Sequence, residues 1–137
     1  MSIQDYSFTE LKASDPANKR AIIVLESELE QQNLNKVLKK KRYQILGKSL
    51  ESKSVIELIR KHKKSILFLD FDLAPFGSMD LLAKIKKSAP EIKIVIIAKK
   101  LEKTQVAEAR NNGVCGFLAK PLSVEAVEKL LSKPSFD

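Results

Sequence analysis

The chain has 137 residues, of which 44% are hydrophobic, with only four Gly and five Pro. This size and composition fit one globular domain and exclude a second catalytic domain. The single cysteine, Cys115, excludes a disulfide within the chain, and no apolar run approaches the ~20 residues that span a bilayer. We therefore expect a soluble protein in a reducing, cytoplasmic setting, without a membrane partner. The net charge of +8 permits an acidic partner without identifying one.

Candidate strands and helices alternate along the chain. The first apolar run, 21–25, is continuous and β-branched, as in a strand that is buried on both faces. The spacing of apolar residues over 28–41 then predicts a helix. The same alternation repeats four times. The further predicted strands are 43–46, 66–69, 92–98 and 116–119, and the further predicted helices are 52–62, 78–87, 102–112 and 123–131.

Five strands that alternate with five helices require a parallel sheet covered on both faces, which is a doubly wound α/β domain. We place this domain at 20–132, after a polar extension at 1–19 and before a tail or the start of a linker at 133–137. Gly113 is predicted to be a left-handed helix cap, and Ser123 to accept the first-turn amides of the last helix. Polar residues at the carboxyl ends of the strands are expected to meet in one crevice.

Three strings at the predicted strand ends resemble a known family. ILFLDFDL at 66–73 and GFLAKP at 116–121 are the most specific, and IIVLESE at 22–28 is a weaker match. Together they resemble the receiver domain of bacterial response regulators, a module that accepts a phosphoryl group from a histidine kinase. The resemblance covers about 20–132 and implies a flavodoxin-like, five-stranded parallel (βα)5 fold.

The resemblance implies a metal site at the crevice. Asp70 stands at the phospho-acceptor position, Asp72 at the position that supplies a backbone carbonyl, and Glu26 at the first acid of the family's pair. The second acid, normally the direct ligand, is replaced by Ser27. A hard cation depends on anionic oxygens. The site formed by Glu26, Asp70 and Asp72 is therefore expected to bind Mg²⁺ weakly or not at all unless the Asp72 side chain compensates, and no other cofactor is expected.

The resemblance also implies a conformational switch that responds to phosphorylation, and two residues of that switch differ in this chain. The hydroxyl that would bind a phosphoryl oxygen falls on Ala98, and the switch aromatic falls on Phe117, which lacks the phenol. Lys120 and Pro121 match the family, with Pro121 where a cis peptide bond is usual. We expect Lys120 to hold the strand ends together by pairing with Asp70 or Glu26. The Phe117 ring is expected to be inward and fixed.

We interpret the chain as a degenerate receiver, or pseudo-receiver: a protein-interaction module of two-component phosphorelay signalling that is independent of phosphorylation and is not an enzyme. Its expected partner face comprises the helix 102–112, the strand 116–119 and the helix 123–131, and a second copy of the chain is one candidate partner. A receiver phosphorylated on Asp70 is the first alternative.

A basic nucleic-acid-binding domain is the second alternative. Basic runs lie at 39–42, 61–64 and 84–87, near the C-terminal ends of predicted helices, so they should gather at the pole opposite the crevice. The helix dipole explains each run locally. No aromatic residues are interleaved with them, so we favour a protein partner over a nucleic acid.

Overall fold

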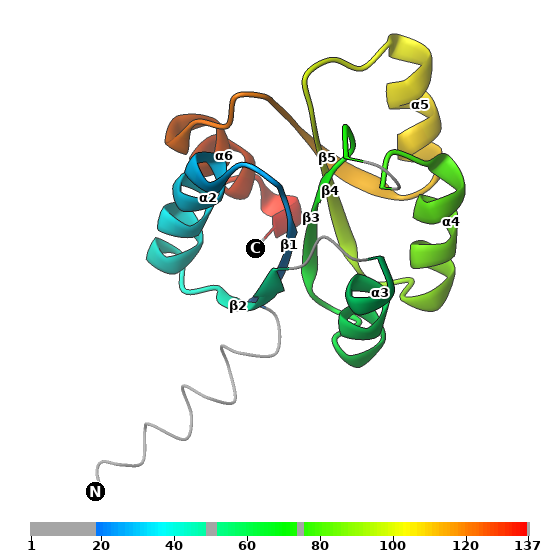
Figure 1. Cartoon of the computed structure of the whole chain (residues 1–137), viewed down its shortest axis with the longest axis horizontal. Coiled ribbons are helices and arrows are strands. Elements are labelled where there is room, and N and C mark those ends of the chain that lie inside the picture. The colour runs from blue at the N-terminus through cyan, green and yellow to red at the C-terminus, as the bar shows by residue number, and fades with distance from the viewer. Residues whose placement is uncertain (1–18, 49–51, 74–75, 137) are drawn as a thin grey trace, which may run out of the picture.

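A computed structural model describes residues 19–48, 52–73 and 76–136, and these form one five-stranded parallel sheet with helices on both faces (Figure 1). The polar extension predicted at 1–19 lies outside the described residues except for Lys19. The elements are β1 (Arg20–Val24), α2 (Glu28–Lys40), β2 (Gln44–Lys48), α3 (Ser52–Lys61), β3 (Ile66–Asp70), α4 (Met79–Ser88), β4 (Lys93–Ala98), α5 (Lys103–Asn111), β5 (Val114–Ala119), α6 (Val124–Leu131) and the 3₁₀ turn η2 (Pro134–Phe136).

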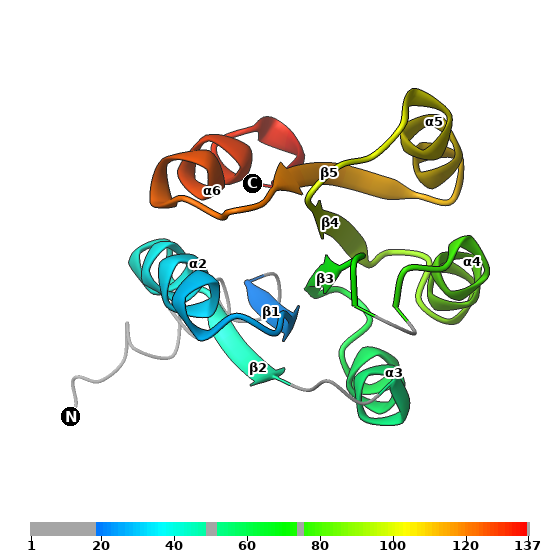
Figure 2. The same ribbon diagram turned by 45° about the horizontal axis from the view of Figure 1, so that its top comes forward.

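The strand order is β2-β1-β3-β4-β5, and every pair of neighbouring strands is parallel. Helices α2 and α6 cover one face of the sheet, and α3, α4 and α5 cover the other (Figure 2). This confirms the predicted doubly wound α/β fold, with the order of flavodoxin-like domains. Because the chain order reverses beside β1, the crevice lies at the carboxyl ends of β1 and β3.

The sheet separates two hydrophobic cores, and its central strands supply both. All five residues of β3 are buried, with Phe68 packing into the core under α2 and α6 and Leu67 and Leu69 into the core under α3, α4 and α5. A strand that is buried on both faces has a continuous apolar sequence. None of the helices in the described part of the chain has the length and hydropathy to cross a membrane.

The ends of the helices are fixed by the residues that the sequence suggests. The Ser123 hydroxyl accepts a hydrogen bond from the Ala126 amide at 3.1 Å, which confirms the predicted cap of α6. Gly113 follows α5 with φ +89°, so its left-handed conformation is also confirmed. A Cβ at this position would lie 2.2 Å from Cε of Lys86.

The two edge strands differ from their predicted bounds. β2 spans Gln44–Lys48 rather than 43–46, and β5 begins at Val114 rather than at residue 116. In β2, Gly47 and Lys48 continue the pairing with β1. An edge strand is held by backbone hydrogen bonds on one side, so its length does not depend on an unbroken apolar run.

At the end of the described chain, residues 133–136 pack onto the domain. The Phe136 side chain is buried in the core formed with α2 and α6. The Tyr43 hydroxyl donates a hydrogen bond to the Phe136 carbonyl at 3.3 Å, and the Lys93 ammonium lies 5.8 Å from the centre of the Phe136 ring. Phe136 lies five residues beyond the end of α6 and two beyond Pro134, so it is part of no apolar periodicity that a sequence window would detect.

We expect Phe136→Ala to lower the free energy of unfolding by about 3 to 5 kcal/mol, because it removes a buried aromatic ring. Urea denaturation measures the change. Leu29→Ala is the control, since the Leu29 side chain is 68% exposed on α2 and its removal should change stability by less than about 0.5 kcal/mol. Equal effects of the two variants would contradict the structural role of Phe136.

Candidate functional site at the carboxyl ends of the strands

Asp70 is the buried acid at the centre of the crevice. It is the last residue of β3, and only 2% of its surface is exposed. Its Oδ1 atom accepts a hydrogen bond from the Asp72 amide at 3.0 Å. A single backbone amide does not compensate a buried carboxylate, so Asp70 needs a cation nearby.

Lys120 supplies that cation from the residue after β5. Its ammonium nitrogen lies 2.8 Å from Oδ1 and 2.9 Å from Oδ2 of Asp70, and its backbone amide donates to the Ala98 carbonyl at 3.0 Å. The Lys120–Pro121 peptide bond is cis. Burial alone would lower the pKa of Lys120, but the hydrogen bonds and charges of Asp70 and then Asp72 outweigh it and raise the pKa. The predicted contact between Lys120 and Asp70 is confirmed.

Asp72 joins the end of β4 to this ion pair. Its Oδ2 atom lies 3.4 Å from the Lys120 ammonium and accepts a hydrogen bond from the Lys99 backbone amide at 2.9 Å. The Asp72 side chain is about one third exposed, so this is the outer wall of the site. The Lys99 side chain itself is exposed, and only its backbone takes part.

Glu26 and Ser27 do not take the places expected for them. Glu26 is exposed, and among the described residues no ion pair joins it to Lys120; Asp72 provides the second carboxylate instead. The expected Lys120–Glu26 pair is therefore wrong. Asp72 is two residues from Asp70 and turns back over it, whereas Glu26 follows a different strand. The Ser27 hydroxyl accepts a hydrogen bond from the Glu30 amide at 3.3 Å and so caps α2.

The donor set for a divalent ion is not assembled at this site. Within the described residues, no group of three or more Asp, Glu, His or Cys side chains is arranged to hold a metal ion. Asp70 and Asp72 face an ammonium instead, and Ser27 is a helix cap. The residues present therefore do not fit the magnesium site that the family's pattern implies.

A second pair of side chains supports the loop that carries Lys120, and sequence analysis did not identify it. Glu30, which is 9% exposed, accepts a hydrogen bond from the Leu122 amide at 2.7 Å. Asn33 donates to the Leu122 carbonyl at 3.0 Å. Both side chains come from α2, so this helix holds the chain two residues beyond Lys120. A glutamate in the first turn of a helix is usually explained by its favourable interaction with the helix dipole. The sequence alone therefore does not indicate that Glu30 also binds the loop after Lys120.

Ala98 and Phe117 line a small cavity of about 250 Å³ beside the site, together with Lys99, Leu101 and Val106. The Phe117 ring is half-buried, with the guanidinium of Arg110 in α5 lying 5.7 Å from its centre. The expected inward ring is therefore only partly correct. Without a phenol hydroxyl, the ring needs no polar partner, and Arg110 stacks on it as a cation on a π face.

We expect Lys120→Met to lower the free energy of unfolding by about 1 to 3 kcal/mol, because it leaves Asp70 buried without its cation. Combining it with Asp70→Asn should cost less than the sum of the two single changes. Chemical denaturation of the four proteins measures this coupling. Additive effects would show that the ion pair contributes no stability.

The pH dependence of the same pair has a defined sign. Because the pKa of Lys120 is raised on folding, its contribution is fully present below the ordinary lysine pKa of about 10.4 and is lost as the pH rises through the raised value. The stability difference between the native chain and Lys120→Met should thus be constant near neutral pH and shrink above about pH 10.4. Denaturation curves over this range test it. A difference that grows at alkaline pH would contradict the assignment.

The sequence of the chain was compared with family models and with known proteins. The family model of the response regulator receiver domain matches residues 21–132. The transcriptional regulatory protein PdtaR of Mycobacterium tuberculosis is 27% identical over 127 residues, covering 88% of this chain and 60% of that protein. The transcriptional regulatory protein CitT of Bacillus subtilis is 28% identical over 89 residues, covering 65% of this chain and 39% of that protein. The chain thus spans between about two fifths and three fifths of these two relatives.

Among solved structures, the signal receiver domain of the putative response regulator NarL from Mycobacterium tuberculosis superposes with a TM-score of 0.71. It is 19% identical and covers 85% of this chain and 95% of that domain, which shows a shared fold. With a buried strand-end aspartate, a lysine paired to it after β5, and a family match over 21–132, this chain belongs to the receiver domains of two-component response regulators.

Proposed function

We propose that this chain is a degenerate receiver, which acts as a protein-interaction module, is not an enzyme, and has an output independent of phosphorylation at Asp70. The observation that carries the proposal is that Ser27, at the family's position for a metal-binding acid, has a neutral hydroxyl that caps α2, while Lys120 Nζ lies 2.8 Å from Asp70 and 3.4 Å from Asp72. An ammonium built into the chain neutralises the acids that a dissociable cation would otherwise neutralise. It also lies against both oxygens of Asp70, where an incoming phosphoryl donor would have to approach.

The loop after β4 provides further support. In a phosphorylated receiver, a hydroxyl at the position of Ala98 would bind a phosphoryl oxygen and draw this loop toward the acceptor, as the family resemblance implies. Ala98 has no hydroxyl, and the Asp72 carboxylate holds the Lys99 amide at 2.9 Å without any phosphoryl group. The loop is thus already attached to the site in the unmodified chain. Phosphorylation of Asp70 would gain no new contact from residue 98.

The partner face that we propose comprises α5, β5 and α6. β5 is an edge strand of the sheet, and it lies between α5 and α6 (Figure 1). A shallow pocket of about 210 Å³ is lined by Leu118 of β5 and by Ala126 and Leu130 of α6. Leu118 and Leu130 are buried, and Phe117, Val124 and Ala126 are half-buried. Half-buried apolar side chains beside an edge strand suit a protein partner, including a second copy of the chain.

A receiver that is still phosphorylated on Asp70 is the second candidate. Asp70 remains at the end of β3, with the paired lysine that the family uses. This candidate requires Lys120 to move from Asp70 toward the phosphoryl group, and it requires a divalent cation to bind without a carboxylate at Ser27. The measurements below separate the two candidates.

We expect low-millimolar Mg²⁺ to leave the amide spectrum around Asp70 and Asp72 unchanged, because Ser27 provides no anionic ligand. Ser27→Asp should restore binding while keeping α2 capped, since aspartate is also a good N-cap. Ser78→Asp is the control, because it places the same charge at the N-cap of α4. Binding by the native chain as tight as that by Ser27→Asp would refute the proposal.

We expect beryllium fluoride with Mg²⁺, a mimic of the phosphoryl group, to leave the amide resonances of residues 98–131 in place. The Lys99 amide already has its acceptor in Asp72, and Ala98 offers no new one. Two-dimensional amide spectra and sedimentation of the same samples measure the response. Shifts throughout α5, β5 and α6 together with a change in dimerisation would show a working phosphorylation switch.

A further inference from the structure

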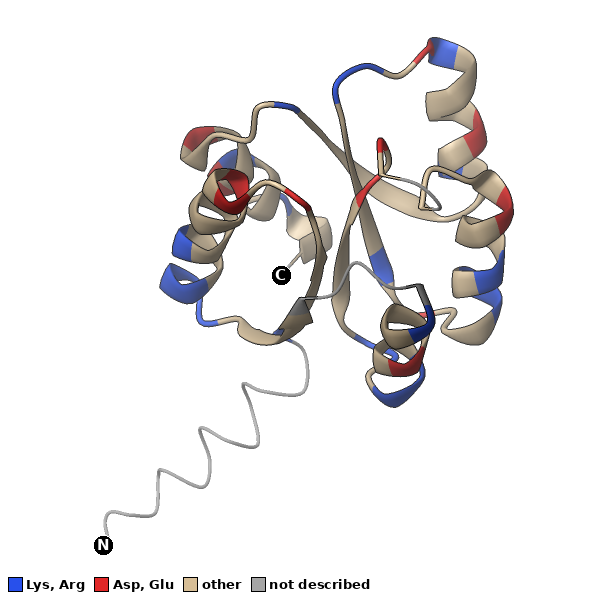
Figure 3. Cartoon of the chain, viewed as in Figure 1, with Lys and Arg blue, Asp and Glu red and all other residues tan. Residues whose placement is uncertain are grey.

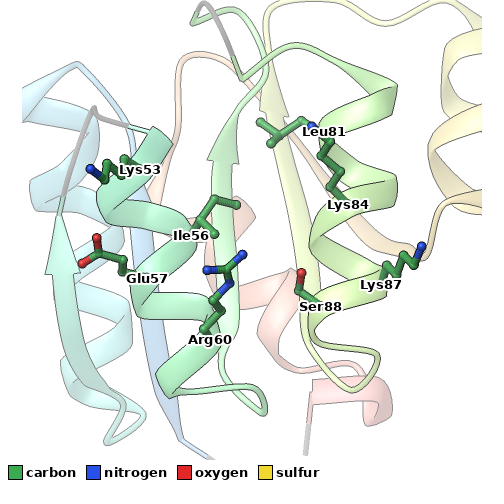
Figure 4. A pocket seen from close by; sticks show the side chains of 8 residues that line it. All are labelled: Lys53, Ile56, Glu57, Arg60, Leu81, Lys84, Lys87 and Ser88. Atoms are coloured by element: carbon green, nitrogen blue, oxygen red, sulfur yellow. The ribbon is translucent and has the colours of Figure 1, made fainter.

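A cavity lies between α3 and α4, away from the crevice and from the α5–β5–α6 face. Its volume is about 610 Å³. Figure 4 shows its lining: Lys53, Ile56, Glu57, Arg60, Leu81, Lys84, Lys87 and Ser88. Four of these side chains are cationic, and only one is acidic. We call this cavity the α3–α4 groove.

No ion pair within the described residues includes Lys53, Arg60, Lys84 or Lys87. Lys86 of the same helix is different, because its ammonium donates to the carbonyls of Pro90 at 3.1 Å and Ile92 at 2.6 Å. The fold thus uses Lys86 internally, whereas the groove cations form no ion pair with another described residue.

The helix dipole does not account for all of these charges. It favours cations in the last turn of a helix, which explains Arg60 in α3 and Lys87 in α4. Lys53 lies in the first turn of α3, where a cation is unfavourable, and that turn contains no acid. Lys84 lies in the middle of α4. Positive charge at the groove is therefore not confined to the C-terminal ends of the helices.

The floor of the groove is apolar. Ile56 and Leu81 are half-buried and extend from α3 and α4 into the space between the helices, with Leu81 at its upper end in the view and Arg60 projecting from α3 below Ile56 (Figure 4). Glu57 lies beside Lys53 at the outer edge of α3 in the same view, so it offsets that lysine rather than Arg60. An apolar centre between cations can accept an apolar side chain that has acidic neighbours.

We propose that the α3–α4 groove binds a short acidic peptide segment of a partner protein, with one aliphatic side chain placed between Ile56 and Leu81. The seven-residue separation of Lys53 and Arg60 gives the groove a length of about 10 Å along α3. That length holds about three residues of extended peptide or two turns of a helix. A nucleic acid would use the cations but not the apolar floor, and the groove has no aromatic side chain for base stacking.

The experiment uses the full chain and a blocked nine-residue peptide that has four acidic residues and a central leucine. Amide spectra should shift for residues of α3 and α4 as the peptide is added. Arg60→Glu with Lys84→Glu should weaken binding by about tenfold or more. Both residues are exposed, so the fold should persist, and circular dichroism checks this. Replacing the central leucine of the peptide with serine should also weaken binding severalfold.

Lys36→Glu is the matched control, because Lys36 is an exposed lysine on α2, on the other face of the sheet. It should leave peptide binding nearly unchanged. The proposal is overturned if Lys36→Glu weakens binding as much as a single reversal in the groove, if the serine peptide binds equally well, or if the shifts fall outside α3 and α4. It is also overturned if a short DNA duplex occupies the groove more tightly than the peptide does.

Discussion

The crevice depends on one ammonium group placed between two carboxylates. Asp70 is almost completely buried, and a buried charge without a partner destabilises a fold by several kcal/mol. Lys120 offsets this cost from the opposite side of β4, so the ion pair links the ends of β3 and β5 across the strand between them. Asp72 extends the link to the backbone at the end of β4. Three adjacent strands are thereby joined at their carboxyl ends by a cation that cannot dissociate.

The position of this cation is in turn fixed by α2. Glu30 and Asn33 satisfy both backbone groups of Leu122, two residues beyond Lys120. Ser27, which stands at the family's position for a metal-binding acid, caps the same helix. The stretch from Ser27 to Asn33 therefore stabilises the fold of this chain. The family's pattern would instead place a metal ligand at position 27.

The sequence predicts most of this structure because the dominant constraints are local. Continuous apolar strands require burial on both faces, and serine at a helix start caps the first turn, so the fold follows. The strand ends that share one crevice, together with the family resemblance, limit the expected partners of Lys120 to Asp70 or Glu26. The choice between Glu26 and Asp72 as the second acid does not follow. It depends on the conformation of the loop after β3, which brings the Asp72 carboxylate to within 3.4 Å of the Lys120 ammonium. Phe136 and the Glu30–Leu122 contact depend on packing between segments 93 and 92 residues apart in the chain.

The topology of the fold explains the positions of some basic residues but not of others. In a parallel sheet with alternating helices, every helix begins near the crevice and ends at the opposite pole. Basic residues at that pole, visible in Figure 3, are therefore stabilised by the helix dipoles and need no ligand to explain them. Lys53 and Lys84 do not share that explanation, because one lies in the first turn of α3 and the other in the middle of α4. Each has an acid four residues away on its own helix, Glu57 for Lys53 and Asp80 for Lys84, so the charges alone require no partner. Their place beside an apolar floor is the observation on which the proposed peptide site rests.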